Sequence, residues 1–277
     1  MNSYMQVRQR LNTRLIGRGL FSCYDTIDST NDEAKRLVAK GAPEGSVVLA
    51  GAQTQGRGRM CRSWNSPPCV GVYLSVIVRP SIMLAEAPRL TLVSAVAVAL
   101  ALKGLGIKCS IKWPNDIMVG TKKISGILTE LCDIQGMRND AKPAIGEPHV
   151  VPVVIGIGVN SGSSLSMFPP ELQNVATSVN MIAESIVSND DLICEILRSL
   201  DQWYYFFIAE PFETILSAWR NLSCTLKEEV CVISSAGSIA GEAEDVTSDG
   251  SLIVRDAAGR LHTVIAGDVV HCRGMRS

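Results

Sequence analysis

The sequence predicts an α+β protein, in which a larger mixed β-sheet domain is followed by a small all-β module. Two features of the pattern carry this prediction. Strands come before most of the helices and follow one another as a meander. From Lys227 the pattern changes to short β segments separated by the turn signals "SDG" and "AAG". Because 277 residues suit one large domain with a small appendage, we predict an N-terminal extension over 1–20, the larger domain over 21–222 and the small module over 223–277.

Local patterns predict the elements of the first half. Residues 21–27 predict a strand, and the next segment predicts a helix closed by Gly41, with Thr30 as its N-cap and Glu33 completing a capping box. The further elements predicted here are a strand over 46–53, a strand over 71–80, a buried apolar helix over 84–103 and a strand over 107–114.

The second half predicts a hairpin, a buried strand and two long helices. The hairpin turns at Gly120, and the polar residues 133–148, which include Gly and Pro, predict a loop. Pro211 is expected in the first turn of the second helix, where its missing N–H costs nothing. The remaining predictions are a strand over 150–160, helices over about 190–209 and 211–221, and the short strands of the C-terminal module.

Composition narrows the class of partner. The formal net charge is −1 and the predicted pI is about 6.3, whereas a protein that binds phosphate backbones usually carries a basic excess. We therefore expect no nucleic-acid partner. The apolar run over 92–102 is shorter than a bilayer-spanning helix requires, so we expect no membrane partner either.

The nine cysteines form no CxxC pair and stand apart from the three histidines. This pattern predicts reduced thiols in an intracellular protein and no protein-bound metal. The first 24 residues contain four arginines and no acidic residue, which leaves open a mitochondrial presequence beside a plain lead-in segment. We expect a cytoplasmic protein, with the mitochondrion as the alternative.

The segment "GRGRMCRSWNSP" (56–67) is the first candidate site. Its glycines allow a sharp turn and close approach to a ligand, and its three arginines offer planar forks of donors that match phosphate or carboxylate oxygens. Trp64 could form the wall of a pocket. A flexible solvated loop and a nucleic-acid patch are the alternatives, and the near-neutral charge argues against the second.

Three more stretches carry chemistry. In "KWPND" (112–116), Lys112 stands at the end of a strand, where it could balance a phosphate or simply be exposed. In "GIGVN" (156–160), glycines after an apolar strand permit close backbone approach, although a tight turn needs them equally. In "DSTN" (28–31), polar side chains at a helix start could bind a head group or only cap the helix.

Taken together and in this order, the motifs "DSTN", "AQTQGRGR", "KWPND", "K.SGIL.E" and "GIGVN" resemble the biotin protein ligase family over residues 24–270. The family's loop G-R-G-R-x-G-R-x-W is matched at all fixed positions but one. The resemblance implies a catalytic domain of the biotin/lipoate ligase type and a C-terminal SH3-like β-barrel. It also implies a protein that is a monomer or a homodimer.

The resemblance implies an ATP-dependent ligase. Such enzymes convert biotin to biotinyl-5′-AMP and pass the biotinyl group to one lysine of a biotin carboxyl carrier domain of a carboxylase. Mg²⁺ is expected to enter as MgATP, held by the phosphates and not by a protein site.

The family's residue roles transfer to matching positions here. The implied catalytic residues are Lys112, Arg57 and Arg59. The implied biotin-binding residues are Ser29, Thr30, Asn31, Gln53, Gly56, Gly58, Trp64, Lys112, Gly126 and Gly156. The implied nucleotide-binding residues are Arg57, Arg59, Arg62, Trp64, Asn115, Lys123, Gly158 and Asn160.

The chain departs from the family pattern in two places. Cys61 replaces the loop glycine, which would cost about 1 kcal/mol if that position needs a positive φ. Only about 20 residues precede the first strand, so we expect no N-terminal DNA-binding domain and no repressor activity.

Two other functions remain open at this stage. A lipoate or octanoate ligase would share the fold, although the Gly/Arg loop and "KWPND" favour biotin. A non-catalytic sensor of the adenylate is the second alternative, and the retained Lys112 argues against it.

Overall fold

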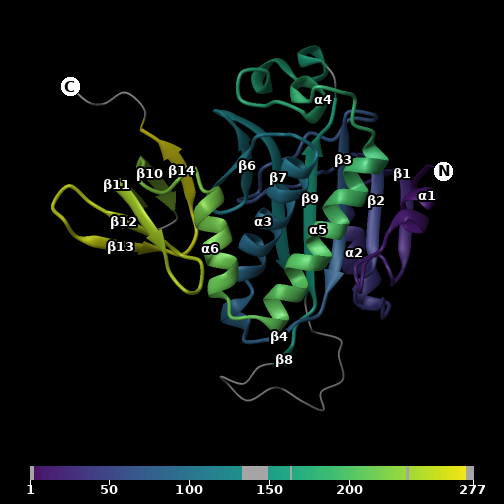
Figure 1. Cartoon of the computed structure of the whole chain (residues 1–277), viewed down its shortest axis with the longest axis horizontal. Helices are drawn as coiled ribbons and strands as arrows, with labels where there is room; N and C mark the ends of the chain where they lie inside the picture. Colours follow the sequence, from purple (N-terminus) through teal and green to yellow (C-terminus); the bar gives the residue numbers. More distant parts are fainter. Residues whose placement is uncertain (1–2, 133–148, 163, 235–236, 273–277) are drawn as a thin grey trace.

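The computed structural model describes residues 3–132, 149–162, 164–234 and 237–272, so the loop predicted over 133–148 lies outside the described residues. A seven-stranded mixed sheet forms the centre of the larger domain (Figure 1). Its strands, in the order in which they pair, are β1 (Phe21–Ile27), β2 (Val47–Gln53), β3 (Gly71–Val78), β9 (Val153–Asn160), β7 (Lys122–Leu131), β6 (Asp116–Val119) and β5 (Ser110–Lys112). β1 and β2 run parallel, and the other neighbours run antiparallel.

Helices cover both faces of this sheet, and the strand alternation decides which side chains meet which helix. Val48 packs with α2 (Thr30–Ala39), whereas Val47 and Leu49 point to the opposite face and join the main core. That opposite face carries α3 (Arg89–Gly104) and α5 (Asn189–Ala209), with α6 (Glu213–Leu222) beside them (Figure 1). The other described elements are α1 (Ser3–Arg10), α4 (Val179–Ile182), the short strands β4 (Ser81–Ile82) and β8 (His149–Val150), and 3₁₀ turns at Leu84–Glu86, Leu165–Met167 and Pro170–Leu172.

The helix predicted over 84–103 begins later, since α3 starts at Arg89 and Leu84–Glu86 is a 3₁₀ turn, but the whole apolar segment is longer than the run over 92–102 on which the membrane prediction rested. By length and composition alone, Leu84–Gly104 would suffice to cross a membrane, so the prediction from the run over 92–102 was too narrow. However, 61% of the 18-residue apolar window within this segment is buried inside the protein. Packing explains why this segment is hydrophobic, because α3 contacts the sheet as well as α5 and α6.

The first 20 residues contribute to the core of the larger domain. Val7, Leu11 and Ile16 are buried in the main core, and α1 packs against α5. The carboxylate of Asp201 on α5 accepts three consecutive backbone N–H groups from residues 14–16, at 2.7–2.9 Å. The boundary at residue 20 stays a prediction, but this segment is packed as part of the fold.

Two predicted helix starts were wrong by a residue or two. The N-cap of α2 is Ser29, whose hydroxyl lies 3.5 Å from the Asp32 nitrogen, because Thr30 is already helical and its hydroxyl is bonded elsewhere. Pro211 lies before the first turn of α6 and not inside it, since Phe212 is the N-cap.

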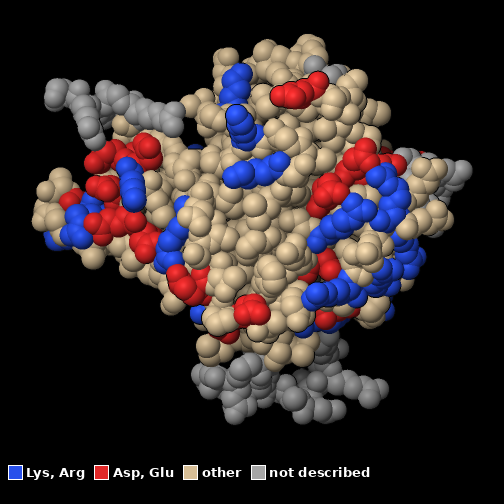
Figure 2. Space-filling model, in the orientation of Figure 1, with Lys and Arg blue, Asp and Glu red and all other residues tan. Residues whose placement is uncertain are grey.

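The C-terminal module is a five-stranded antiparallel sheet, consistent with the SH3-like prediction. Its strands are β10 (Glu229–Ser234), β11 (Gly237–Val246), β12 (Leu252–Arg255), β13 (Leu261–Val264) and β14 (Asp268–His271), paired in the order β13-β12-β11-β10-β14. The indole N–H of Trp113 donates to the Gly250 carbonyl at 3.0 Å, and this bond joins the module to the end of β5. On the face seen in Figure 2, acidic and basic side chains lie intermingled around a largely uncharged centre.

Candidate active site

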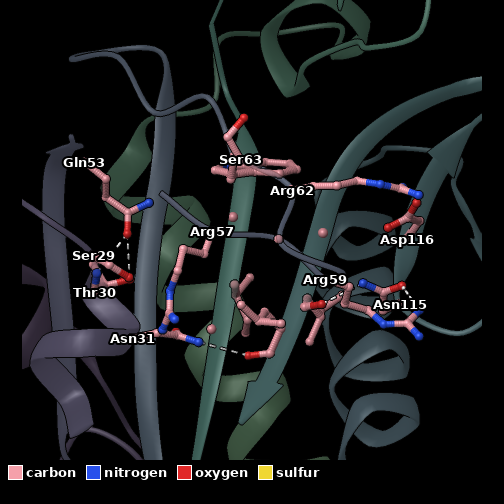
Figure 3. Close-up of a pocket in the computed structure, with 18 of the residues that line it drawn as sticks. Ser29, Thr30, Asn31, Gln53, Arg57, Arg59, Arg62, Ser63, Asn115 and Asp116 are labelled. Atoms are coloured by element: carbon pink, nitrogen blue, oxygen red, sulfur yellow. Dashed lines mark hydrogen bonds between the residues drawn. The ribbon is translucent and has the colours of Figure 1, made fainter. Parts of the chain in front are cut away.

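One cavity of about 110 Å³ collects most of the predicted site residues. It lies over β7 and β9, between the start of α2, the Gly/Arg loop and the start of β14. Figure 3 shows Ser29, Thr30 and Gln53 at one end and Arg59 and Asn115 at the other, with Arg57 between them. The predicted residues that line it are Ser29, Thr30, Asn31, Gln53, Arg57, Gly58, Arg59, Arg62, Trp64, Asn115, Lys123, Gly126, Gly156 and Gly158.

The first end of the cavity is a network of polar side chains at the N-terminus of α2. The Gln53 side-chain oxygen accepts the Thr30 backbone N–H at 2.8 Å and the Thr30 hydroxyl at 3.1 Å. The hydroxyl of Ser75, which is fully buried on β3, lies 2.8 Å from the Thr30 hydroxyl and 2.6 Å from the Asn31 side-chain oxygen. Three elements therefore fix the orientation of these groups before any ligand arrives.

The floor of the cavity consists of glycines that face large side chains. A Cβ on Gly156 would lie 2.1 Å from the Asn31 side-chain oxygen, and one on Gly158 would lie 2.6 Å from the Trp64 indole. A Cβ on Gly126 would come within 3.1 Å of both Trp64 and Lys123, whose ammonium lies 5.4 Å from the indole ring centroid. A Cβ at Gly156 or Gly158 would force the side chain above it to move, and a Cβ at Gly126 would press on both of its neighbours.

Arg57 is held at the rim by two carboxylates that the sequence analysis did not assign. Its guanidinium lies 2.5 Å from Asp32 and 3.0 Å from Glu130. Glu130 also accepts from Asn31 at 2.7 Å and pairs with Lys35 at 2.6 Å. Burial alone would raise the pKa of Glu130, but the hydrogen bonds from Lys35 and Asn31 outweigh it and lower that pKa, so the carboxylate stays charged.

Arg59 is the half-buried cation at the other end. Its guanidinium donates to the Asn115 side-chain oxygen at 3.1 Å and to the Gly267 carbonyl at 3.4 Å. Burial lowers the pKa of Arg59, and the nearby Asp116 carboxylate opposes that shift. Since Asn115 also donates to the Ile127 carbonyl at 2.7 Å, its amide orients Arg59 within the cavity wall.

The Gly/Arg loop folds as a small hairpin over the cavity. Arg57 pairs with Ser63, the Gly58 N–H donates to Arg62 O at 2.7 Å, and the Arg62 N–H donates back to Arg59 O at 3.1 Å. The two central residues, Met60 and Cys61, have φ of +52° and +58°. Positive φ at both central positions is the signature of a type I′ turn, which favours Asn-Gly, so Cys61 stands where a glycine fits best.

A second cavity, of about 360 Å³, lies on the other side of Trp64. It contains Lys112 and Asn160, which the first cavity does not, and it shares Trp64, Lys123 and Asp116 with the first. Its apolar wall comes from Phe168, Leu172, Val175 and Ala176.

Lys112 is half-buried at the end of β5, opposite Asp116 in the β5–β6 register. Burial lowers the pKa of Lys112, and Asp116 opposes that shift. Asp116 itself lies 2.5 Å from the Lys123 ammonium. Asn160 is buried and donates to the Thr177 carbonyl at 3.0 Å.

The predicted site residues are thus divided between the two cavities, with one exception. Gly56 lines neither cavity and instead lies under the loop, where a Cβ would meet Trp64 O at 2.4 Å. The residues that sequence reasoning missed are Asp32, Ser75, Glu130, Phe168, Leu172 and Asp268. Glu130 could have been assigned from the sequence, because it is the last residue of the motif "K.SGIL.E". No local sequence pattern indicates a role for Asp268.

Comparison with known proteins identifies the family of the chain. The model of the biotin/lipoate A/B protein ligase family matches residues 23–137, and that of the biotin protein ligase C-terminal domain matches residues 225–272. Fold and site together thus define a protein of the biotin/lipoate ligase class. The bifunctional ligase/repressor BirA of Bacillus subtilis is 34% identical over 268 residues, which cover 96% of this chain and 78% of the relative.

A second relative matches over nearly its whole length. The biotin–[acetyl-CoA-carboxylase] ligase of Mycobacterium tuberculosis is 30% identical over 282 residues, with 95% of this chain and 94% of the relative covered. The chain belongs to the biotin protein ligase family. Its fold is also that of the Aquifex aeolicus biotin protein ligase solved in complex with biotin and ATP, with a TM-score of 0.73, 24% identity, and 91% and 97% of the two chains covered.

Proposed function

We propose that this protein is an ATP-dependent biotin protein ligase. In the first step a carboxylate oxygen of biotin attacks the α-phosphate of ATP, giving biotinyl-5′-AMP and pyrophosphate. In the second step the amine of a specific lysine on a biotin carboxyl carrier domain attacks the acyl carbon, giving the amide and AMP. The observation that carries the proposal is the pair of adjoining cavities on either side of Trp64, which have an uncharged polar network at one end and are lined by five cations, namely Arg57, Arg59, Arg62, Lys112 and Lys123.

The polar network at the start of α2 suits the ureido head of biotin. This head presents one carbonyl acceptor and two N–H donors. Ser29 and Thr30 carry hydroxyls that can donate or accept, and the Asn31 and Gln53 amides lie beside them. Because these groups are uncharged, the site favours a neutral urea over a second carboxylate.

The cations suit the chemistry at the carboxylate and the phosphates. Biotin carboxylate and ATP repel each other, and negative charge grows on the leaving pyrophosphate. Arg59 and Lys123 line the first cavity. Lys112 lines the second cavity and lies opposite Asp116, a residue that both cavities share. Preorganised cations in a partly desolvated site stabilise this charge, and losing one donor typically costs about 10²–10³ in rate.

The second cavity suits the adenosine. Its apolar wall, which includes Phe168 and Leu172, can cover a flat base, while Asn160 supplies polar atoms at the edge. Mg²⁺ would enter as the substrate MgATP, with the phosphates as its main ligands. Among the described residues there is no group of three or more His, Cys, Asp or Glu side chains that could hold a metal ion.

The direct test is mass spectrometry of a biotin carboxyl carrier domain after incubation with this protein, biotin and MgATP. We expect one biotinyl group on one lysine, and none when ATP is left out. The lipoate alternative is separated by exchange of labelled pyrophosphate into ATP. Exchange that depends on biotin supports the proposal, and exchange with lipoate but not with biotin would overturn it.

We also propose a cytoplasmic location, with a carboxylase carrier domain as the protein partner and with neither nucleic acid nor membrane as a partner. None of the nine cysteines, all of which lie among the described residues, forms a disulfide, which is what a reducing compartment favours. Imaging of the full chain fused at its C-terminus to a fluorescent protein distinguishes this location from the mitochondrial alternative. The oligomeric state, monomer or homodimer, is measured by light scattering.

The strained turn of the Gly/Arg hairpin leads to a prediction on retention of the intermediate. Cys61→Gly is expected to remove about 1 kcal/mol of left-handed strain, less a few tenths for the added chain entropy of glycine. The closed hairpin should then be more populated, and release of biotinyl-5′-AMP into solution should slow about two- to fivefold. Released adenylate is measured by chromatography during turnover without carrier domain.

Cys61→Ala is the matched control, because it removes the thiol but keeps the strained backbone. We expect it to leak adenylate at the rate of the unchanged protein. Equal leakage from the glycine variant would mean that the hairpin tolerates cysteine at this turn.

A further inference from the structure

The C-terminal module reaches the Gly/Arg hairpin through two consecutive residues. Asp268, the first residue of β14, forms an ion pair with Arg62 and lines the first cavity. The carbonyl of Gly267 accepts from Arg59 at 3.4 Å. Two of the three loop arginines therefore contact a module that lies about 200 residues further along the chain.

We propose that Asp268 is a positioning residue that, through Arg62, holds the Gly/Arg hairpin closed over the cavity. The C-terminal module thereby controls how long the activated intermediate is retained. This inference rests on the proposed function, and it assigns a role that the sequence motifs do not contain. Asp268 acts on the hairpin and not on the reacting atoms.

The hairpin is held from two sides. On the side of α2, Arg57 forms ion pairs with Asp32 and Glu130 of the catalytic domain, which we call the first clasp. On the opposite side, Arg62 forms an ion pair with Asp268 of the module, which we call the second clasp. Between these two ion-paired sides, Arg59 donates to the Asn115 side chain and to the Gly267 carbonyl, and the turn at Met60 and Cys61 is strained. Because the turn is strained, closure depends on these contacts of the three arginines, and the ion pair with Asp268 is the one that a single carboxylate of the module supplies.

Asp268 is itself rigidly placed. β14 pairs with β10, with Asp268 opposite Ile233. The preceding Gly267 fits so closely that a Cβ would lie 2.8 Å from the Ile233 carbonyl oxygen. The module is in turn joined to the catalytic domain by the Trp113–Gly250 hydrogen bond. The carboxylate is thus held by the sheet of the module, and in this proposal the hairpin is the part that opens.

Partly exposed ion pairs contribute little to global stability, but a pair on a mobile segment still shifts the local equilibrium between open and closed forms. Removing the carboxylate should therefore open the hairpin without unfolding the protein. We expect the open population to rise about two- to fivefold, the range that such pairs cover. Proteolysis of a rapidly opening segment reports that population.

The test is limited cleavage by trypsin after Arg57, Arg59 and Arg62, followed by mass spectrometry of the full chain without substrates. Asp268→Asn is expected to be cut about two- to fivefold faster in this hairpin, and Asp268→Glu to restore slow cleavage. Glu244→Gln is the matched control, because Glu244 forms an ion pair with Arg255 in the same module, away from the hairpin. It should be cut at the original rate.

A second readout uses biotin, MgATP and carrier domain. The ratio of adenylate released into solution to carrier domain biotinylated is expected to rise two- to fivefold in Asp268→Asn and to stay unchanged in Glu244→Gln. A merely structural role for Asp268 would lower both products together and leave the ratio unchanged. Because the cleavage readout needs no activity, failure of the proposed function and failure of the clasp give different results.

Thermal unfolding checks that the module remains folded. If Asp268→Asn unfolds at a lower temperature, Arg62→Gln tests the same pair from the catalytic domain, with cleavage scored after Arg57 and Arg59. Unchanged hairpin cleavage in whichever of these variants stays folded would overturn the proposal, and so would an unchanged ratio of released to transferred product.

Discussion

Lys112→Ala is expected to lower the rate of biotinyl-5′-AMP formation about 10²–10³-fold while the protein stays folded. Lys112 sits half-buried at the end of β5, beside Asp116, and lines the second cavity. Its ammonium is a compact positive charge at the place where, under the proposed function, the biotin carboxylate and the α-phosphate meet. Lys112 forms no ion pair among the described residues, so its removal leaves no carboxylate without its ion-pair partner. The measurement is biotin-dependent exchange of labelled pyrophosphate into ATP.

Two variants make this experiment decisive. Lys108→Ala removes an exposed lysine four residues earlier and should leave exchange unchanged. Lys112→Arg retains the charge but replaces the ammonium by a planar fork, so we expect only partial activity. Exchange at the original rate in Lys112→Ala would refute the role of this residue in the reaction.

Gly156→Ala is expected to weaken biotin binding by a factor of ten or more. The new Cβ would lie 2.1 Å from the Asn31 side-chain oxygen, which must move away from Ser75. Breaking this buried network leaves polar groups unpaired at about 1–3 kcal/mol each, which also lowers the free energy of unfolding. Calorimetric titration with biotin measures the affinity, and denaturant unfolding measures the stability.

The matched control is Gly104→Ala at the end of α3, where no atom lies within 4 Å of the added Cβ. We expect unchanged biotin affinity and stability equal to or slightly above the original, because alanine favours a helix. Normal biotin affinity in Gly156→Ala would mean that Asn31 does not take part in binding.

Periodicity and turn chemistry predicted most of the fold. The strand over 21–27 is confirmed with those bounds, and the hairpin around Gly120 is confirmed as β6 and β7. These predictions work because alternation of buried positions and glycine turns are local properties. The N-cap at Thr30 failed because a tertiary contact with Gln53 takes up the hydroxyl that capping would use.

The site was predictable only where a residue belongs to a compact motif. The polar start of α2, the three loop arginines and the glycines of β7 and β9 do converge on one cavity. The counter-ions Asp32 and Asp268 could not be assigned, because their roles depend on how distant segments pack. The placement of Lys112 in a second cavity depends on where the Trp64 ring lies, and no spacing rule determines that.

The position of Trp64 has a thermodynamic consequence. Its indole rests on Gly126 and Gly158 and lines both cavities, so we expect a ligand that spans them to move the ring. Whichever substrate arrives first bears that reorganisation free energy, and the second binds to a protein already rearranged. Linkage then requires reciprocity, since the factor by which biotin tightens nucleotide binding must equal the factor by which nucleotide tightens biotin binding.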